Sequence, residues 1–333
     1  MTDPLPILQV EGLDIRFGAS DAPPTVEDLS FHIRAGETLC LVGESGSGKS
    51  ISAMSLLGLL PDTAHVSARK IVFDGVEIDS RDPKALKRLR GQGIAMIFQD
   101  PMSSLNPAFT VGYQMIEAIR LTPGVGKKAA REKAIGYLEL VRIPDAARRM
   151  DSYPHQLSGG MRQRVMIAMA LSRNPKLLIA DEPTTALDVT FQAQILGLID
   201  DLKEKFGTAV LFITHDLGVV AETADRVAVM YAGRLVEAAG VTAVFDDPRH
   251  AYTIGLMQAS PRVNDAHHRL KDIPGAVPDV AARPPGCSFA PRCAVALDAC
   301  RVTGAAAPRV DGDHMSRCIR SGELRRLMEM PDD

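Results

Sequence analysis

The stretch GESGSGKS, from Gly43 to Ser50, decides the fold. It follows the apolar run GETLCLV and precedes a helix that we expect from about Lys49 to Leu60. The stretch fits G-x-x-x-x-G-K-[ST], a pattern whose glycines let the backbone approach phosphate closely. Backbone N–H groups and the positive end of the helix then bind anionic oxygens. The sequence therefore predicts a phosphate site between a strand and a helix of an α/β fold.

The residue types in this loop predict two further contacts. Lys49 should reach the β- and γ-phosphates of ATP, and Ser50 should give its hydroxyl to Mg²⁺. The loop residues that we expect to hold the nucleotide are Gly43, Glu44, Ser45, Gly46, Ser47, Gly48, Lys49, Ser50 and Ile51.

The rest of the chain alternates strands with helices. Continuous apolar runs, as in buried strands, are IAMIF (94–98), KLLIA (176–180) and AVLFIT (209–214). Alternating or hairpin patterns are 7–17, 29–33, 70–78 with a turn at Asp74-Gly75, and 226–238 with a turn at Ala232-Gly233. Helices are expected at about 189–206 and within 248–261. These patterns predict a mostly parallel sheet covered on both faces, with a small antiparallel β-subdomain beside it.

Domain organisation follows from the same patterns. We expect a nucleotide-binding α/β domain over residues 1–245, interrupted by an inserted helical subdomain at about 100–172. Residues 246–333 should form a C-terminal extension that is mostly loop and rich in Pro, Gly and Cys.

Composition limits the partners. The 333 residues carry a net charge of −3, which gives no reason to expect nucleic acid or an anionic membrane surface as the main partner. No apolar stretch approaches the ~20 residues of a membrane-spanning helix. The N-terminus MTDPLPILQV lacks the pattern of a secretory signal, so we expect a cytoplasmic chain.

Acids and amides at strand ends predict the chemistry of hydrolysis. LLIADE ends in two acids: Asp181, which with Ser50 should hold Mg²⁺, and Glu182, which can polarise an attacking water. Gln99 follows the strand IAMIF in the same way, and by itself it indicates no role. His215 closes AVLFIT, where it should meet the γ-phosphate. Each of these signals alone is also typical of structural residues.

A second anion site is predicted at LSGGMRQR, from Leu157 to Arg164. Ser158 is a good N-cap, and Gly159 and Gly160 open an apolar helix. A helix start of this kind binds anions. The phosphate loop lies more than a hundred residues earlier, so the anion for this second site must come from elsewhere.

The order Lys49, Gln99, LSGGM, LLIADE, Asp188 and His215 resembles the nucleotide-binding domains of ABC transporters, from about Val10 to Ala239. The signature differs from its commonest form by Met161 in place of Gln. The resemblance implies a P-loop NTPase core of ABC type and an ATPase in which Lys49, Gln99, Glu182 and His215 are catalytic. It also implies that Gln99 joins Ser50 and Asp181 in holding Mg²⁺.

The same resemblance implies a head-to-tail pair of such domains. Ser158, Gly159 and Gly160 would then bind the γ-phosphate held by the partner chain. Asp188 would lie in the loop that crosses the interface, or serve as an N-cap of the next helix. Phe17 would stack on adenine, or pack in the core.

Further motifs resemble the dipeptide and oligopeptide importer branch: QDPMSSLNP, YPHQLSGGM, DEPTTALDVT, and PRHAYT with Ala251 where Pro is usual. That branch implies an ATP-hydrolysing subunit at the cytoplasmic face of the membrane. Its partners would be a second ABC ATPase chain, either a copy or a homologue, two integral-membrane permeases that contact the segment after Gln99, and an extracytoplasmic solute-binding protein. Close relatives of the branch move nickel and other small solutes.

Four cysteines crowd the extension: Cys287, Cys293, Cys300 and Cys318. A reducing cytoplasm disfavours disulfides, so a four-thiolate site for zinc or an iron–sulfur cluster is the main alternative to unrelated thiols. Zinc ribbons usually contain C-x₂-C pairs, which are missing here. GCSFAPRC resembles the peptide-importer C-terminal region, which implies a [4Fe–4S] cluster. Arg283, Arg292, Arg301 and Arg317 could offset the negative charge of such a site, or be solvated surface.

Two other classes of protein are alternatives to a transporter ATPase. Soluble ABC ATPases that act on DNA carry a long insertion, but only 59 positions separate Gln99 from Ser158. Ribosome-binding forms usually hold two cassettes in one chain, and this chain has one. A regulatory module without hydrolysis is disfavoured by Glu182 and His215.

Overall fold

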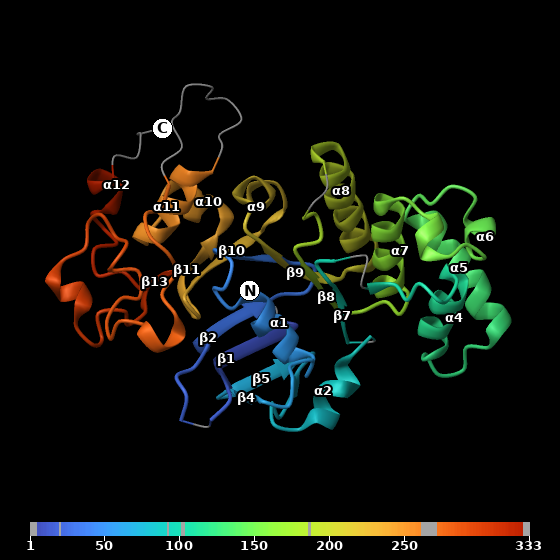
Figure 1. The fold of residues 1–333 in the computed structure, drawn as a ribbon, viewed down its shortest axis with the longest axis horizontal. Coiled ribbons are helices and arrows are strands. Elements are labelled where there is room, and N and C mark those ends of the chain that lie inside the picture. The colour runs from blue at the N-terminus through green and yellow to red at the C-terminus, as the bar shows by residue number, and fades with distance from the viewer. Residues whose placement is uncertain are drawn as a thin grey trace. The chain divides into compact units, whose positions relative to one another are not determined.

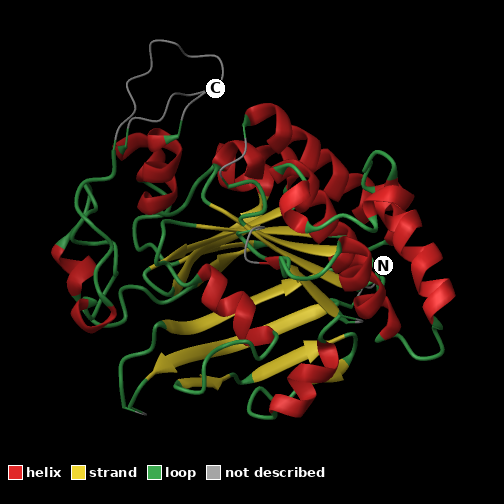
Figure 2. Ribbon diagram, turned by 45° about the vertical axis from the view of Figure 1, so that its right-hand side comes forward, coloured by secondary structure: helices red, strands yellow, loops and turns green. Residues whose placement is uncertain are grey.

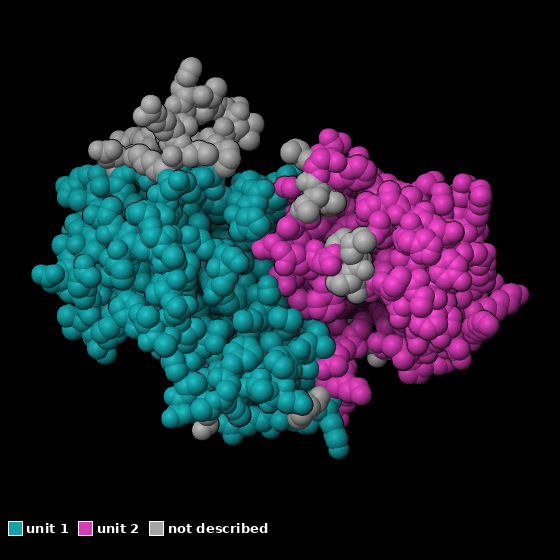
Figure 3. Space-filling model, viewed as in Figure 1, with its two compact units in different colours: residues 1–86, 213–333 teal, residues 87–212 magenta. Residues whose placement is uncertain are grey.

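The computed structural model describes residues 5–19, 21–91, 93–100, 104–185, 188–260 and 272–328. The chain divides into two compact units, residues 1–86 with 213–333 and residues 87–212, coloured separately in Figure 3. The start of the predicted helical block at 101–103 and the last five residues of the predicted extension lie outside the described residues.

An antiparallel sheet forms one part of the first unit (Figure 1). The strand order is β2-β1-β5-β6, and β4 also pairs with β1. The bounds are β1 Leu8–Phe17, β2 Val26–Ile33, β4 Ala64–Ser67, β5 Lys70–Phe73 and β6 Val76–Glu77. Leu8 of β1 lies opposite Ile33 on one side and Phe73 on the other, so the apolar face of this alternating strand is buried.

The first unit also contains strands in the order β12-β13-β11-β10-β3. Their bounds are β3 Thr38–Val42, β10 Arg226–Tyr231, β11 Arg234–Gly240, β12 Arg309–Asp311 and β13 His314–Ser316. β10 runs parallel to the fully buried β3, and the predicted turn at Ala232-Gly233 returns the chain as β11. The expectation of a mostly loop-like extension was wrong for β12 and β13, because β13 pairs with β11 and β12 pairs with β13.

The helices of the first unit are short. They are α1 Lys49–Leu56, α9 Leu217–Thr223, α10 Val241–Asp246, α11 Ala251–Ala259 and α12 Leu324–Leu327, with 3₁₀ turns η2 Val280–Ala282 and η3 Asp298–Arg301. α1 ends four residues before the predicted Leu60, because Gly58 takes φ 59° in the turn that follows. α2 Pro83–Leu89, which the sequence did not predict, spans the division between the units.

The second unit holds most of the long helices. They are α4 Val111–Arg120, α5 Lys127–Leu140, α6 Ala146–Arg149, η1 Pro154–Gln156, α7 Gly159–Leu171 and α8 Val189–Phe206. Figure 2 draws the helices of the chain in red and its strands in yellow. β7 Ile94–Ile97 runs parallel to β8 Leu177–Asp181, and β9 Ala209–Thr214 crosses the division between the units. α8 has the predicted bounds, and Gly207 at φ 64° ends it.

None of the helices in the described part of the chain combines the length and the apolar composition that crossing a bilayer requires.

Candidate functional site

The phosphate loop joins β3 to α1 in the first unit. Gly43 takes φ 152°, and a Cβ there would lie 2.2 Å from the carbonyl oxygen of Met230. Gly48 takes φ 100° at the N-cap of α1, a conformation that side chains disfavour. The buried Lys49 Nζ donates to the carbonyl oxygens of Gly43 (2.7 Å) and Glu44 (3.0 Å). The ammonium thus points into the loop, where phosphate oxygens would also meet it.

Glu44 in this loop is held by residues that the sequence did not single out for the role. Its backbone N–H donates to the hydroxyl of Tyr252 in α11 (2.8 Å). Its carboxylate accepts from Nη1 and Nη2 of Arg292, at 2.6 and 2.9 Å. These partners are more than two hundred residues away in the chain, so no local pattern could have indicated them.

In the second unit, strand ends bring Gln99 and Glu182 together. Gln99 Nε2 donates to Glu182 Oε2 at 2.9 Å, and the hydroxyl of Thr185 donates to the same oxygen at 2.9 Å. Glu182 has φ 45°, an uncommon conformation for a residue with a side chain. Asp181 is the buried last residue of β8. Sequence reasoning missed Thr185, although its position three residues after Glu182 suits such a turn.

The start of α7 has the predicted form. Ser158 is the N-cap, and its hydroxyl accepts from the N–H of Met161 at 3.3 Å. A Cβ on Gly160 would lie 2.7 Å from the Phe191 ring, whereas a Cβ on Gly159 would meet nothing within 4 Å. Gly160 is therefore explained by packing against α8, and Gly159 keeps one side of the helix start open.

The remaining predicted residues are placed as follows. Asp188 is the N-cap of α8 and accepts from the N–H of Phe191 at 2.9 Å, which confirms its capping role. His215 is exposed directly after β9, in the first unit. Phe17 is half-buried at the end of β1, with Ala64 as its cross-strand neighbour. Interface crossing by Asp188, phosphate contact by His215 and adenine stacking by Phe17 stay predictions.

Cys287, Cys293, Cys300 and Cys318 line one pocket of the first unit, together with His250. Burial raises the pKa of the Cys287 and Cys293 thiols, and raises that of Cys318 to about 11. Among the described residues, no three His, Cys, Asp or Glu side chains form a group that could hold a metal ion. The four thiols thus share a pocket without being arranged as the ligands of one ion.

His250 faces this pocket in a defined protonation state. Burial lowers the pKa of His250 to about 3, so the ring is neutral. Its Nδ1 accepts from the N–H of Tyr252 at 3.1 Å, which leaves the ring proton on Nε2. Nε2 lies 4.0 Å from the sulfur of Cys287 and can donate a weak hydrogen bond to it.

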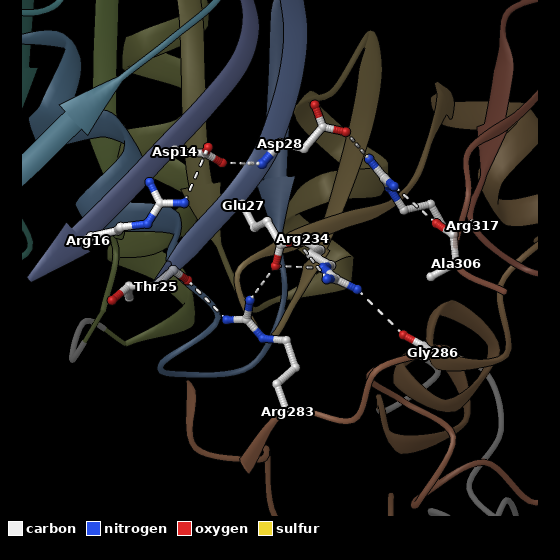
Figure 4. Close-up of polar contacts among 10 residues, drawn as sticks. All are labelled: Asp14, Arg16, Thr25, Glu27, Asp28, Arg234, Arg283, Gly286, Ala306 and Arg317. Atoms are coloured by element: carbon white, nitrogen blue, oxygen red, sulfur yellow. Dashed lines mark hydrogen bonds and ion pairs between the residues drawn. The ribbon is translucent and has the colours of Figure 1, made fainter. Parts of the chain in front are cut away.

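Three of the four arginines near the cysteines have a different role from either of those expected. Arg283 binds Glu27 (2.9 Å), Arg317 binds Asp28 (2.8 Å), and Arg292 binds Glu44. Figure 4 shows the first two arginines reaching from the extension to β2, with Arg234 of β11 bound to Glu27 as well. Because these carboxylates belong to the amino-terminal part of the chain, the arginines hold the extension to the amino-terminal segments of the first unit. Arg301 is exposed.

Comparisons with known proteins agree with this geometry. The model of the ABC transporter family matches residues 26–185, and that of the oligopeptide/dipeptide transporter C-terminal region matches residues 236–300. The chain is 50% identical to the "Probable peptide ABC transporter ATP-binding protein y4tR" of Sinorhizobium fredii, over 96% of this chain and 97% of that protein. It is 48% identical to the dipeptide transport ATP-binding protein DppD of Escherichia coli, over 94% of this chain and 96% of that protein.

Solved structures show the same fold. The ABC transporter component CbiO1 of Clostridium perfringens has a TM-score of 0.62 at 30% identity, covering 75% of this chain and 95% of that one. The cassette MJ0796, solved as a dimer with ADP and phosphate after hydrolysis, has a TM-score of 0.61 at 25% identity, covering 70% and 98%. The chain described here belongs to the ABC transporter family, as an ATPase that carries the C-terminal region of the oligopeptide and dipeptide transporters.

Proposed function

We propose that this chain is the ATP-hydrolysing subunit that powers the import of dipeptides or oligopeptides through partner permeases. The observation that carries the hydrolytic part is the position of Glu182, whose carboxylate is fixed by Gln99 and Thr185 at the end of β8. A carboxylate held in one orientation can accept a proton from a water that attacks the γ-phosphate.

The other loop residues bind and orient the nucleotide. Lys49 exchanges its contacts with loop carbonyls for the β- and γ-phosphates, and Gly43–Ile51 give backbone N–H groups to the same oxygens. Ser50, Gln99 and Asp181 have the hydroxyl, amide and carboxylate oxygens that Mg²⁺ prefers. The ion supplies neutralisation of phosphate charge, and His215 contacts the γ-phosphate.

A second ATPase chain completes the site. Gly159 leaves the start of α7 open, and Ser158 caps it, so this end can receive a phosphate that another chain presents. The pair lies head to tail, with Asp188 in the loop that crosses the interface and Phe17 against adenine. The second chain is a copy or a homologue.

The relatives support the solute and the partners. Their names state peptide or dipeptide transport, and the match to the transporter C-terminal region supports the same branch. We place the chain at the cytoplasmic face of the membrane, with two permeases and a solute-binding protein that delivers peptide. We take residues 1–245 as the ATPase domain, with its inserted helical subdomain at about 100–172, and residues 246–333 as the extension.

Two variants test hydrolysis in the purified chain and its complex. Lys49→Ala should lose ATP binding, because it removes the charge that meets the phosphates. Glu182→Gln should bind ATP normally and lower hydrolysis by about 10²–10⁴-fold, because an amide cannot accept the proton. Near-normal turnover by Glu182→Gln, with Lys49→Ala inactive, would remove Glu182 from this role.

For the extension, we propose that the four cysteines bind one [4Fe–4S] cluster as thiolates. Their common pocket supports this, since a four-iron cluster is larger than one ion and its ligands stand further apart. When bound, the cluster supplies folding free energy to a segment with few apolar residues of its own. His250 donates its Nε2 proton toward Cys287. A single Zn²⁺ is the alternative occupant, and it would require the thiols to move from the positions that they have in this structure, where they are not grouped around one ion.

Metal analysis of chain purified without oxygen tests this site. A brown protein with iron and acid-labile sulfide, bleached by any one Cys→Ser change among the four, is the expected result. Colourless protein with one equivalent of zinc would show that the four cysteines bind zinc instead of an iron–sulfur cluster. Protein without metal, in which all four thiols react freely while folded, would contradict both.

A further inference from the structure

Glu44 of the phosphate loop contacts residues of the extension. Three of its groups are engaged: its N–H donates to the Tyr252 hydroxyl, its carbonyl accepts from Lys49 Nζ, and its carboxylate accepts from Arg292. The position of Glu44 therefore affects where the ammonium of Lys49 stands.

The side chain of Arg292 is buried and held in one orientation by its neighbours. Its side chain is 5% exposed, and its guanidinium lies 5.8 Å from the ring centre of Tyr231 and 6.0 Å from that of Phe289. Its Nε donates to the carbonyl oxygen of Pro274 at 2.8 Å, and Nη2 also donates to that of Ile273 at 3.2 Å. A guanidinium fixed in this way holds a carboxylate in one orientation, as a flexible surface pair does not.

The cysteines border this arginine on both sides in the chain. Cys293 follows Arg292 directly, and the N–H of Arg292 donates to the carbonyl oxygen of Phe289 at 2.9 Å. The N–H of Cys287 donates to the carbonyl oxygen of Cys300 at 2.8 Å, which closes the turn that contains Arg292. The geometry of the cysteine turn thus sets the position of the guanidinium.

The negative charge of Glu44 makes its contact with Arg292 important for the binding of ATP. Glu44 is a carboxylate within a loop that must receive a triphosphate, and two negative groups in one small site repel each other. Arg292 offsets that charge and keeps the carboxylate turned toward the extension. Without the arginine, the carboxylate is left partly buried and uncompensated.

We propose that Arg292 is a positioning residue for ATP, through which the cysteine-rich extension holds the phosphate loop by Glu44. This rests on the proposed role of the loop as the ATP site. The extension then does more than fold itself, because it sets the affinity of the same chain for nucleotide.

Steady-state ATPase kinetics of the full complex test the inference. Arg292→Met should raise the KM for ATP about tenfold, which corresponds to the loss of one charge-assisted contact, and change kcat less than twofold. Arg292→Lys should lie between, since it keeps the charge and loses the bidentate contact. Arg301→Met, an exposed arginine of the same extension, is the matched control and should leave KM unchanged.

A double-mutant cycle separates positioning from misfolding. In the Glu44→Gln background the repulsive charge is absent, so Arg292→Met should change KM by much less than in the natural chain. An equal change in both backgrounds, or a fall in kcat alone at unchanged KM, would overturn the inference. The Lys49→Ala variant is measured in the same experiment. ATP binding that survives this change would contradict the proposed ATP site itself, independently of Arg292.

Discussion

Glu182 adopts a left-handed conformation, which turns its carboxylate toward Gln99 and Thr185. Thr185→Val removes the hydrogen bond from the Thr185 hydroxyl to Oε2 and keeps the shape of the side chain. One such bond contributes about 1 kcal/mol, so kcat should fall about fivefold with KM for ATP unchanged. Thr185→Ser, which keeps the hydroxyl, should restore most of the rate. Equal kcat for Thr185→Val and the natural chain would show that the bond does not orient Glu182.

Glu27 permits a test of how the extension is fastened. Burial acts to raise its pKa, but hydrogen bonds and charges from Arg234 and Arg283 outweigh burial and lower the pKa below 4.5. Its contribution to stability is therefore present above pH 4.5 and lost as the pH falls through the lowered pKa. Glu27→Gln should reduce the free energy of unfolding by about 1–3 kcal/mol at neutral pH.

The difference should shrink as the pH falls from 4.5 through the lowered pKa of Glu27, because the carboxyl group then takes up a proton and becomes neutral like the amide of glutamine. Urea unfolding of the two proteins across this range measures it. Glu222→Gln, on the exposed surface of α9, is the control and should differ little at any pH. A Glu27→Gln deficit that stays constant into acid would mean that the ion pairs do not contribute.

Single residues were predicted from sequence only where a local pattern marked them. Ser158 as an N-cap followed from the helix start. The contact between Gln99 and Glu182 was not predicted, because each residue was marked only by the end of its own strand. Arg292 beside Glu44 could not be predicted, because 248 positions separate them and only the folded extension brings them together.

At the scale of elements, Glu237 joins three segments. It is fully buried in β11, and its carboxylate accepts from the N–H groups of Arg249 and His250, from the hydroxyl of Thr253 and from His314 Nε2 of β13. Glu237→Ala leaves these donors buried without an acceptor and should destabilise the protein by about 3–5 kcal/mol. Limited proteolysis should then cut the extension first.

Glu323→Ala, at an exposed position in the same extension, is the control. It should resist protease as the natural chain does. Equal resistance of Glu237→Ala would mean that β13 is held by its strand pairing alone.

The start of α7 is the second element to test. Ser158→Arg should block the phosphate of a partner chain but leave ATP binding to the isolated chain intact, because the chain's own ATP lies at the phosphate loop. Ser158→Thr keeps the N-cap and should preserve ATP-dependent pairing. Size-exclusion chromatography in the Glu182→Gln background measures the ATP-dependent pairing of the Ser158→Arg and Ser158→Thr variants. Nucleotide binding to the isolated chains is measured in parallel. Loss of ATP binding by folded, isolated Ser158→Arg would contradict the cross-interface role.

Elements with a strong local pattern were predicted well. α8 matched its bounds, and the hairpin turns at Asp74-Gly75 and Ala232-Gly233 have the positive φ angles that such turns require. The short strands β4, β12 and β13 were missed, because three or four half-polar residues carry no clear alternation. Pairing with β1 and β11, respectively, gives β4 and β13 their conformation.

At the scale of the whole molecule, one chain contains the two helix starts at which we propose that phosphate binds. The first unit carries the phosphate loop, and the second carries the signature helix and Glu182. The order of these motifs in the sequence was sufficient to predict the ABC fold, which the solved structures confirm. The docking of the extension was not predictable, since it depends on ion pairs between segments far apart in the chain.

The rate of ATP hydrolysis by the complete complex, measured with and without peptide, tests the central claim most directly. The chain would be reconstituted with its permeases and solute-binding protein in vesicles. We expect peptide-loaded binding protein to stimulate hydrolysis and to drive peptide uptake, and both to stop with Glu182→Gln. A hydrolysis rate that peptide does not change, or peptide uptake that continues with Glu182→Gln, would contradict the claim that this ATPase powers peptide import.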